Sequence, residues 1–368
     1  MIENVWHKRI LSCFLTGVTC LTVAGCTFNT DKTELTAEVA PVKYNRDAIV
    51  TIVSDDGDYQ TGAFLDELSA KYGYKVTVAG IVNWIEPYLE EWKGIEARGG
   101  VEIISHSFTH LKMDEESAVS NEELKHEITD SITFYKENFL TDQIAFIPPE
   151  NTMCVDGYQL LEQNGIVAIR RGNRGYNLLA PEDGYGMAQW YNLCTFGIMD
   201  VQTTEERNAW IDEAVEERAW IIEMWHNISE DGARGGYQEI SFEKADEHMG
   251  YIAQMVQQEK IWVASLIEAS KYLLEKENAA VSATYSNSKM KVKLRCDKKV
   301  VPEEVYNEPL TVIILLPETT GNVLYQERKK DDRVRIREEN GETYLEFEML
   351  PNSEVTINLA EEGIQFAE

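Results

Sequence analysis

The stretch that decides the fold class of this chain is AIVTIVSDDG, residues 48–57. Its first six residues form an apolar, β-branched run, which is typical of a short strand buried inside a sheet. The turn residues Ser-Asp-Asp-Gly follow directly, and residues 61–72 then place Phe64, Leu65 and Leu68 at helical spacing. The sequence therefore predicts a buried strand, a polar turn and a helix in immediate succession.

The same alternation continues along the chain. We expect further strands at 75–82, 101–105, 144–148, 166–170 and 219–225. We expect helices at 86–98, 156–164, 204–217, 241–257 and 261–277, and another that begins at a Ser120/Glu123 capping box. Repeated strand–helix units favour an α/β fold with a parallel sheet, which we predict to close into a barrel over residues 45–277.

The pattern changes after residue 280. Segments such as MKVKLRC (290–296), LTVIILLP (310–317) and TYLEFEML (343–350) alternate by twos and are separated by turn residues. This pattern predicts a small all-β, sandwich-like domain over residues 283–368. Its simplest role is to cap the first domain, and a carbohydrate-binding role would need an aromatic platform that the sequence does not clearly show.

The first 25 residues are expected to be a lipoprotein signal peptide rather than part of the fold. A short cationic start precedes the apolar run ILSCFLTGVTCLTVA (10–24), and Leu21 to Cys26 resembles a bacterial lipobox. We therefore expect a lipid on Cys26, a tether over residues 26–44 and an exported, membrane-anchored protein of the cell envelope. The alternative is an ordinary signal peptide or an uncleaved anchor.

Charge and cysteine content narrow the possible functions. The 368 residues include 34 Lys and Arg against 64 Asp and Glu, a formal charge of −30. Such a surface repels phosphate backbones, so we expect no nucleic-acid partner. Cys154, Cys194 and Cys296 remain after the signal region and allow at most one disulfide. We interpret all three as packing residues.

Three polar clusters directly follow three of the predicted strands. Asp55 and Asp56 follow the strand at 48–53, His106 and His110 follow 101–105, and His226 follows 219–225. The carboxyl ends of parallel strands lie on one face, so the clusters should converge there. By contrast, His126 and His248 fall within predicted helices and are interpreted as surface residues.

Each cluster also has an ordinary structural explanation. An Asp-Asp-Gly sequence is a common turn, and a single histidine after a strand is usually a packing residue. Together, however, two imidazoles and one carboxylate make a metal site with open positions, suited to Zn²⁺ or another first-row divalent metal. A second carboxylate as base and a separate histidine as acid would complete the groups needed for metal-assisted acyl hydrolysis.

The order of these motifs resembles carbohydrate esterase family 4, the polysaccharide deacetylases. The resemblance rests on Ser54-Asp55-Asp56-Gly57, His106-Ser107-Phe108-Thr109-His110 and Met224-Trp225-His226, and covers roughly residues 45–277. It implies a distorted (β/α) barrel and an acetylated polysaccharide or oligosaccharide as substrate. It also implies Asp55 as base, His226 as acid, and a metal on Asp56, His106 and His110.

Two departures from the family pattern stand out. In the third motif Ile147 occupies the place of an arginine that orients the base, and Glu150 occupies the place of a tyrosine whose backbone N–H faces an oxyanion. Arg170 or Arg171 could replace the missing arginine. The fourth motif is not found, which leaves Asp200 as a candidate partner for His226.

These departures leave other functions open. One is a catalytically impaired, deacetylase-like lipoprotein that binds glycans, and another is a related metal hydrolase of non-sugar amides. Neither the linkage of the acetyl group, through N or O, nor the glycan follows from the residues. The candidate sugar-binding faces are Trp84, Tyr176, Trp190 and Trp225, with substrate-shaping loops at 172–176 and 231–237.

Overall fold

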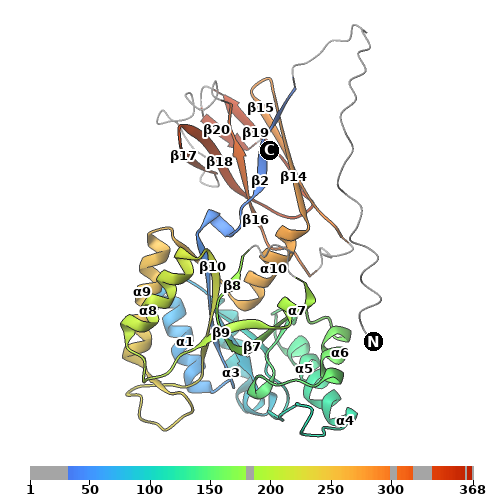
Figure 1. Ribbon diagram of the computed structural model, residues 1–368, viewed down its shortest axis with the longest axis vertical. Helices are drawn as coiled ribbons and strands as arrows, with labels where there is room; N and C mark the ends of the chain where they lie inside the picture. Colours follow the sequence, from blue (N-terminus) through green and yellow to red (C-terminus); the bar gives the residue numbers. More distant parts are fainter. Residues whose placement is uncertain (1–31, 180–185, 299–304, 318–333, 361–362, 367–368) are drawn as a thin grey trace.

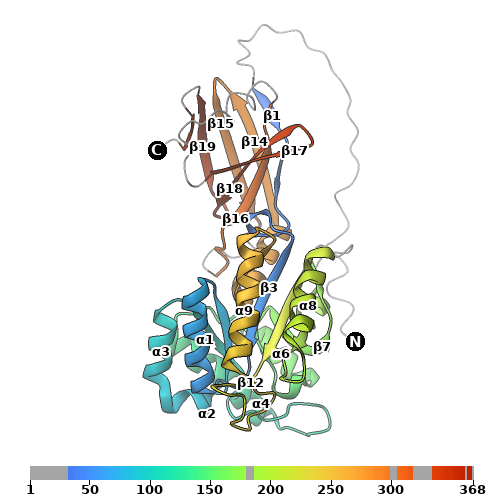
Figure 2. The same cartoon turned by 90° about the vertical axis from the view of Figure 1, so that its left-hand side faces the viewer.

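The computed structural model describes residues 32–179, 186–298, 305–317, 334–360 and 363–366. A barrel wrapped by helices lies at one end of the long axis and a group of antiparallel strands lies at the other (Figures 1 and 2). The predicted signal peptide and Cys26 lie outside the described residues. None of the helices in the described ranges combines the length and the apolar character needed to cross a membrane.

Seven parallel strands form the closed barrel. In order they are β3 (Ala48–Ser54), β4 (Val76–Gly80), β5 (Val101–Ser105), β6 (Ala145–Phe146), β7 (Ala168–Arg174), β9 (Leu193–Gly197) and β10 (Ala219–Trp225). Strand β10 pairs with β3 from Trp220↔Ile49 to Trp225↔Ser54, and this pairing closes the ring. The short strands β8 (Asn177–Leu178) and β13 (Ile261–Val263) pair with β10 and β3. The predicted (β/α) barrel is therefore confirmed.

Strand β3 shows why its sequence forms the centre of this sheet. Every residue from Ala48 to Ser54 is buried. Ile49 and Val53 belong to one core cluster together with Trp220, whereas Ile52 packs with the helix residue Leu65 in a second cluster. Alternate residues thus cover the two faces of the strand, and both faces are shielded from water, as a continuous apolar run requires.

The helices surround the barrel in the positions that the sequence predicted, with differences at their ends. Their bounds are α1 (Tyr59–Tyr72), α2 (Val82–Ile85), α3 (Leu89–Ala97), α4 (Asn121–Leu124), α5 (Ser131–Asn138), α6 (Val155–Gln163), α7 (Met187–Trp190), α8 (Thr204–Glu216), α9 (Phe242–Gln257) and α10 (Leu266–Glu277). Shorter helical turns are η1 (Lys43–Asn45), η2 (Glu86–Tyr88), the π-helix η3 (Lys125–Asp130) and η4 (Pro149–Asn151).

The helix predicted from residue 261 begins later than expected. Ile261–Val263 form strand β13 beside β3, and the side chain of Ser265 caps α10 by accepting from the N–H of Glu268. An apolar run of three residues fits either a helix or a strand. Here the outcome is decided by Ala48 to Val50 of β3, which do not pair with β4 and are free to pair with Ile261 to Val263.

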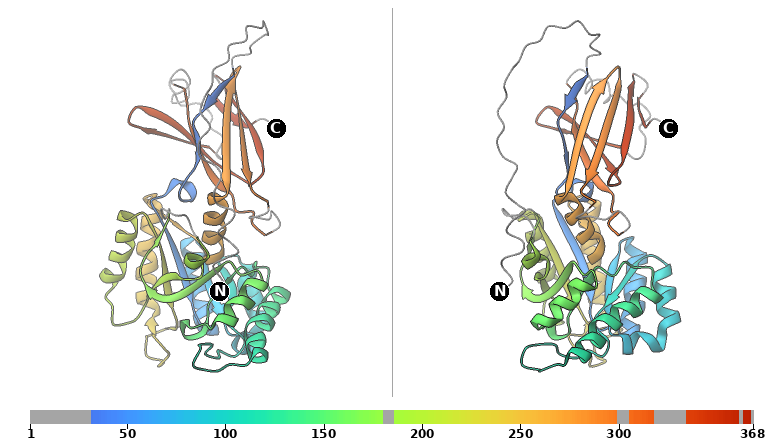
Figure 3. Two further views of the ribbon diagram at one scale, coloured as in Figure 1. Left: turned by 45° about the vertical axis from the view of Figure 1, so that its right-hand side comes forward. Right: turned by 90° about the vertical axis from the view of Figure 1, so that its right-hand side faces the viewer.

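The C-terminal strands form two antiparallel sheets, which confirms the predicted all-β region. One sheet has the order β1 (Thr33–Leu35), β14 (Ala279–Ser286), β15 (Lys289–Cys296), β19 (Glu354–Ala360), β20 (Gly363–Phe366), and the other has β17 (Val334–Glu339), β18 (Glu342–Met349), β16 (Leu310–Leu315), β2 (Ala37–Val39). Val292, Ile314 and Phe347 share one core cluster, so the two sheets pack face to face. Figure 3 shows these strands beyond the end of α10.

The tether predicted over residues 26–44 is wrong for its second half. Thr33 to Leu35 pair with β14, and Ala37 to Val39 pair with β16. The stretch is short and mainly polar, so it shows no pattern of its own. It becomes strand because the β sheets offer edges whose backbone N–H and C=O groups need partners.

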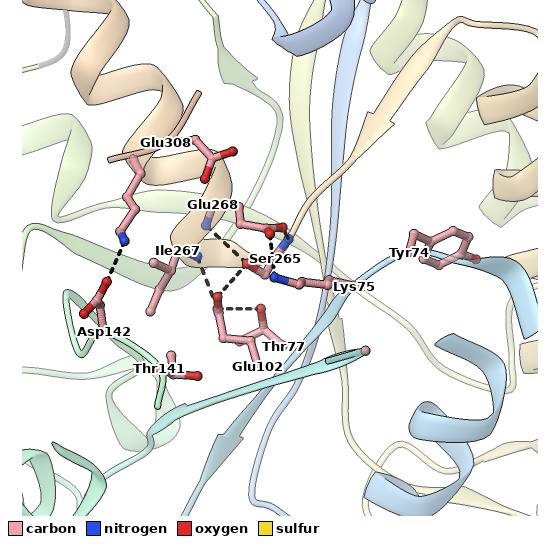
Figure 4. A network of polar contacts seen from close by, with 12 residues as sticks. Tyr74, Lys75, Thr77, Glu102, Thr141, Asp142, Ser265, Ile267, Glu268 and Glu308 are labelled. Carbon is pink, nitrogen blue, oxygen red and sulfur yellow. Dashed lines mark hydrogen bonds and ion pairs between the residues drawn. The ribbon is translucent and has the colours of Figure 1, made fainter. Parts of the chain in front are cut away.

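A buried polar network joins β4, β5 and α10 at the end of the barrel away from the predicted site (Figure 4). The Glu102 carboxylate accepts hydrogen bonds from Thr77 Oγ1 at 3.1 Å, Ser265 Oγ at 2.5 Å and the Ile267 N–H at 3.2 Å. Burial raises the pKa of Glu102 to about 7 despite these donors. These hydrogen bonds attach α10 to β4 and β5 at the amino-terminal end of the barrel. The predicted site lies at the other end, where the strands have their carboxyl ends.

Candidate metal and catalytic site

The structure brings the six predicted site residues together at the carboxyl ends of the barrel strands. They border one cavity of about 570 Å³, whose lining residues are Asp55, Asp56, His106, His110, Pro148, Glu150, Asn151, Met224, His226 and Tyr237. The loops that carry them follow β3, β5, β6 and β10. The convergence inferred from strand ends is thus present in the folded chain.

Asp56, His106 and His110 form a compact group of metal-ligand atoms. The Asp56 Oδ1 atom lies 3.5 Å from His106 Nε2 and 3.6 Å from His110 Nε2. One ligand atom from each residue lies within 4.8 Å of the other two. His106 Nδ1 donates to the carbonyl oxygen of Ile147 at 2.7 Å, so Nε2 is the ring nitrogen that faces the group. This donor set fits a divalent metal.

The charges within this group influence one another strongly. Burial opposes ionisation of Asp56, but the hydrogen bond with His106 and the neighbouring imidazoles outweigh it and lower the pKa of Asp56. Burial and the charge of His106 lower the pKa of His110. Burial lowers the pKa of His106, but Asp56 and Asp55 more than compensate, so the pKa is raised. The Asp56 carboxylate thus favours the protonated form of His106 but not that of His110, and a divalent cation would supply the positive charge in place of that proton.

Several residues around the cavity have a strained backbone. Asp56, Ser107, His110, Glu150 and Asn151 all have positive φ, at 75°, 73°, 68°, 51° and 57°. None of them is glycine, and a left-handed conformation costs such residues roughly 1–2 kcal/mol each. Strain of this kind persists where surrounding contacts fix the backbone, and it is found most often at functional sites.

Arg170 of β7 holds the carboxylate of Asp55. Its Nη2 atom donates to both carboxylate oxygens, at 2.6 Å to Oδ1 and in a shorter contact to Oδ2, and both side chains are buried. Arg170 Nη1 also donates to Asn151 Oδ1 at 2.9 Å. Of the two arginines suggested by the sequence, Arg170 is therefore the one beside Asp55. Arg171 instead donates to the carbonyl oxygen of Asn151 at 2.8 Å.

The position of Arg170 follows from the strand register. Phe146 of β6 pairs with Ile169 of β7, so residues 147 and 170 stand at the next level of the two strands. Ile147 is completely buried in the apolar core. The guanidinium group thus enters from the adjacent strand at the level where the family pattern has its arginine.

His226 lies next to Asp55 but lacks a partner for its second ring nitrogen. His226 Nε2 is 3.9 Å from Asp55 Oδ2, and burial lowers the pKa of His226, although Asp55 and Asp56 act in the opposite direction. Its Nδ1 is buried and has no hydrogen-bond partner among the described residues. The suggested partner Asp200 is wrong, because its carboxylate pairs with Lys244.

His248 is not the surface residue that its place in a helix suggested. It is fully buried, and its Nε2 and Nδ1 contact Glu223 Oε1 at 2.7 Å and Asn208 Oδ1 at 2.8 Å. Glu223 lies on β10 and also accepts from Trp225 Nε1 at 3.0 Å. The pair is buried between β10 and helices α8 and α9. His126 is exposed, as expected, and Cys154, Cys194 and Cys296 are free.

The aromatic side chains suggested as sugar-binding faces differ in accessibility. Trp190 and Trp225 are buried, and the Tyr176 hydroxyl donates to Glu213 Oε2 at 2.8 Å. Trp84 remains 48% exposed. Tyr237 borders the cavity and is 65% exposed. The sequence predicted a substrate-shaping loop at 231–237 but did not single out this residue as a sugar-binding face.

Glu127 is a supporting residue that the sequence gave no reason to select. Its buried carboxylate accepts from the N–H groups of Phe108 at 3.1 Å and Thr109 at 2.9 Å, and from Thr109 Oγ1 at 2.5 Å. It therefore fixes the loop between His106 and His110. The nearest sequence signal was the Ser120/Glu123 capping box, which marks the helix but not this contact.

Comparison with known proteins agrees with the motif pattern. A family model described as polysaccharide deacetylase matches residues 43–169. No curated protein matches the chain in sequence.

Several solved structures are similar to the chain at low identity. A putative polysaccharide deacetylase from Mycobacterium smegmatis is 17% identical over 65% of this chain and 95% of its own, with a TM-score of 0.45. A family 4 acetyl xylan esterase from Clostridium thermocellum, in complex with cobalt, is 17% identical over 61% and 91%, with a TM-score of 0.41. A CE4 family pseudoenzyme from Bacillus anthracis is 13% identical over 61% and 65%, with a TM-score of 0.41. The family match thus shows a polysaccharide deacetylase-like segment over residues 43–169, which carries Asp55, Asp56, His106 and His110.

Proposed function

We propose that this protein is a metal-dependent hydrolase that removes acetyl groups from a carbohydrate. The observation that carries the proposal is the meeting of Asp55, Asp56, His106, His110 and His226 around one cavity. These residues come from three separate strand ends, and the set contains a metal-binding group, a separate carboxylate and a separate imidazole. Metal-assisted acetyl hydrolysis uses each of these.

Asp56, His106 and His110 are the proposed metal ligands. Two imidazole nitrogens and one carboxylate oxygen suit Zn²⁺, although other first-row divalent ions accept the same donors. When bound, the cation supplies Lewis acidity, which polarises the acetyl carbonyl group and makes water more acidic. The hydrogen bond from His106 Nδ1 to Ile147 holds one ligand ring in the required tautomer.

Asp55 and His226 are the proposed proton carriers. Asp55 accepts the proton of the attacking water, and the hydrogen bonds from Arg170 fix the direction of its carboxylate. His226 donates a proton to the sugar nitrogen or oxygen that leaves. The backbone N–H of Glu150, at the mouth of the cavity, stabilises the oxyanion, and one such donor is typically worth roughly 3 kcal/mol.

The substrate and the location belong to the same proposal. The acetyl group is bound through N or O to a polysaccharide or oligosaccharide, and the lipobox-like sequence ending in Cys26 supports an exported lipoprotein at the cell envelope. The net charge of −30 disfavours a nucleic-acid partner.

One observation favours a second candidate function. The buried His226 Nδ1 has no acceptor among the described residues, so the proposed acid lacks the support that would orient it and stabilise its charge. A glycan-binding protein with impaired catalysis would have the same cavity and the same metal ligands. Turnover separates the two candidates.

The test is acetate release from a panel of N-acetylated and O-acetylated glycans by metal-loaded protein, with small non-sugar amides as a comparison. We expect release from at least one glycan, and none after D55N, which should keep its bound metal. H106A should lose metal as well as activity. Glycan binding without acetate release would support the second candidate, and an active D55N protein would disprove the role of Asp55.

A further inference from the structure

Tyr237 is an exposed aromatic ring beside the proposed catalytic acid. Its side chain borders the cavity and is 65% exposed, against 48% for Trp84 and 47% for Tyr88. The Tyr237 ring centre lies 4.7 Å from that of His226, and the two ring planes are almost perpendicular, at 87°. A large aromatic side chain therefore borders the cavity, in contact with the ring of the group that would protonate a leaving sugar.

The loop that carries Tyr237 is tightly fixed from within. It connects β11 (Ile228–Ser229) to β12 (Ile240–Ser241), which pair in parallel. The Glu239 carboxylate, 9% exposed, accepts from the N–H groups of Arg234 at 2.9 Å, Gly235 at 2.6 Å and Gly236 at 2.8 Å. It also accepts from the hydroxyl of Ser229. Four donors on one carboxylate give this loop a defined shape.

The same loop is tied to the start of α1, next to the two catalytic-site aspartates. The Arg234 guanidinium donates to Asp58 Oδ1 at 3.0 Å, Gln60 Oε1 at 2.6 Å and Asn227 Oδ1 at 2.9 Å. Asn227 Nδ2 in turn donates to the carbonyl oxygen of Tyr237 at 3.0 Å. The last of these bonds uses the backbone of Tyr237. Its side chain makes only a long hydrogen bond within the loop, from Gln238 Nε2 to the Tyr237 hydroxyl at 3.4 Å, in addition to the ring contact with His226.

A fixed, exposed ring at this place is suited to a saccharide. The C–H face of a sugar ring packs on an aromatic face, and a rigid tyrosine loses little conformational entropy when it binds. Since His226 must reach the leaving atom, the sugar that carries this atom has to lie beside Tyr237. Resting on the proposed function, we propose that Tyr237 is the stacking platform for the acetylated sugar ring.

The charge of the cavity defines the class of sugar. Asp55, Asp56 and Glu150 border it, and its described lining residues include no lysine or arginine. With a divalent cation bound and the Arg170 guanidinium paired with Asp55, the three carboxylates leave no excess of positive charge. The platform therefore takes a neutral acetylated sugar in preference to a polyuronate, because the described lining residues offer no lysine or arginine to pair with uronate carboxylates.

Binding to an inactive background tests the platform without turnover. Calorimetry on metal-loaded D55N should detect an N-acetylglucosamine oligomer or an O-acetylated xylo-oligosaccharide, and an acetylated oligouronate should bind at least tenfold more weakly. Adding Y237A should weaken the neutral ligand about tenfold, whereas Y237F, which keeps the ring, should stay within about twofold. Tyr344 of β18 provides the matched control, since Y344A removes a ring far from the cavity and should leave affinity unchanged.

The outcomes separate this inference from the proposed activity. Equal affinity of D55N and D55N/Y237A, or no binding of either neutral oligosaccharide to D55N, overturns the platform. Tighter binding of the oligouronate overturns the assignment to neutral sugars. Tyr237-dependent binding with no acetate release by the wild type supports the platform and rejects the deacetylase activity. Acetate release that is insensitive to Y237A does the reverse.

Discussion

At the scale of single residues, the most informative contact is that between Arg170 and Asp55. A carboxylate that acts as a base needs a fixed direction, and a guanidinium group in contact with both oxygens provides it. The chain places isoleucine where the family pattern has arginine, and supplies the guanidinium from the neighbouring strand at the same level. Orienting Asp55 therefore requires a guanidinium group at a particular place in space, but either of the two neighbouring strands can supply it.

We expect R170Q to reduce kcat by roughly 10²-fold, because Asp55 loses the group that orients it. Metal content should not change, since Arg170 contacts none of the three proposed ligands. Steady-state kinetics and metal analysis measure the two effects. An R170Q enzyme with wild-type kcat would contradict the positioning role.

Rescue provides the control for this prediction. Residue 147, directly after β6, stands at the level of residue 170, so the double variant I147R/R170A offers Asp55 a guanidinium group from that position instead. Activity should recover at least partly relative to R170A. Equal inactivity of both folded proteins would show that the strand of origin matters as much as the charge.

At the scale of secondary-structure elements, the loops after the strands hold the site and the helices behind them hold the loops. The π-helix Lys125–Asp130 adds a residue to the regular helical path and places the buried Glu127 against the loop from His106 to His110. This loop contains two non-glycine residues of positive φ, Ser107 and His110. The hydrogen bonds to Glu127 offset the cost of that conformation.

E127A should therefore weaken metal binding by about tenfold, the lower range for loss of an outer-shell support. The His106 and His110 rings remain, but the loop that sets their spacing loses the three hydrogen bonds that it donates to the Glu127 carboxylate. Metal titration with a competing chelator measures the effect. E122Q, an exposed change at the start of the same helical segment, is the control and should bind metal as the wild type does.

At the scale of the whole molecule, the barrel and the β sheets are joined through buried acidic groups. The Glu275 side chain of α10 accepts from the N–H of Glu308 at 3.0 Å, and its second oxygen is buried with no partner among the described residues. Burial raises the pKa of Glu275 to about 8 and that of Glu348 to about 7. These two carboxyl groups are therefore protonated in the folded protein at a pH where an unfolded chain has lost both protons.

The sign of the pH effect on stability follows from this difference. The ordinary pKa of a glutamate is near 4.5, and that of Glu275 is about 8 in the folded protein. Stability is therefore lost as pH rises from about 4.5 to about 8, at up to about 1.4 kcal/mol per pH unit for one such group. Thermal unfolding should show a lower Tm at pH 8.5 than at pH 5.5.

Substitution at Glu275 identifies the group responsible. Glutamine resembles the protonated carboxyl and cannot ionise, so E275Q should gain stability relative to the wild type as pH rises. The control E216Q changes an exposed glutamate of α8 and should follow the wild type at both pH values. Parallel Tm profiles for E275Q and the wild type would show that Glu275 does not ionise in this range.

The sequence alone determined the alternating α/β barrel, the all-β C-terminal region and the residues of the candidate metal group. These features depend on local patterns, because the period of apolar residues selects strand or helix and strand ends collect polar side chains on one face. For the same reason the strand ends at Asp55, His106 and His226 could be expected to converge.

Only the tertiary structure decided which distant groups support the site. Arg170 reaches Asp55 because two strands lie in register, and Glu127 reaches Thr109 because a π-helix packs behind the loop. His248 is buried because β10 supplies Glu223 as its partner, and residues 33–39 become strands because sheet edges stand free. Such contacts depend on where a second element lies in space, and the local sequence around one residue does not specify that position.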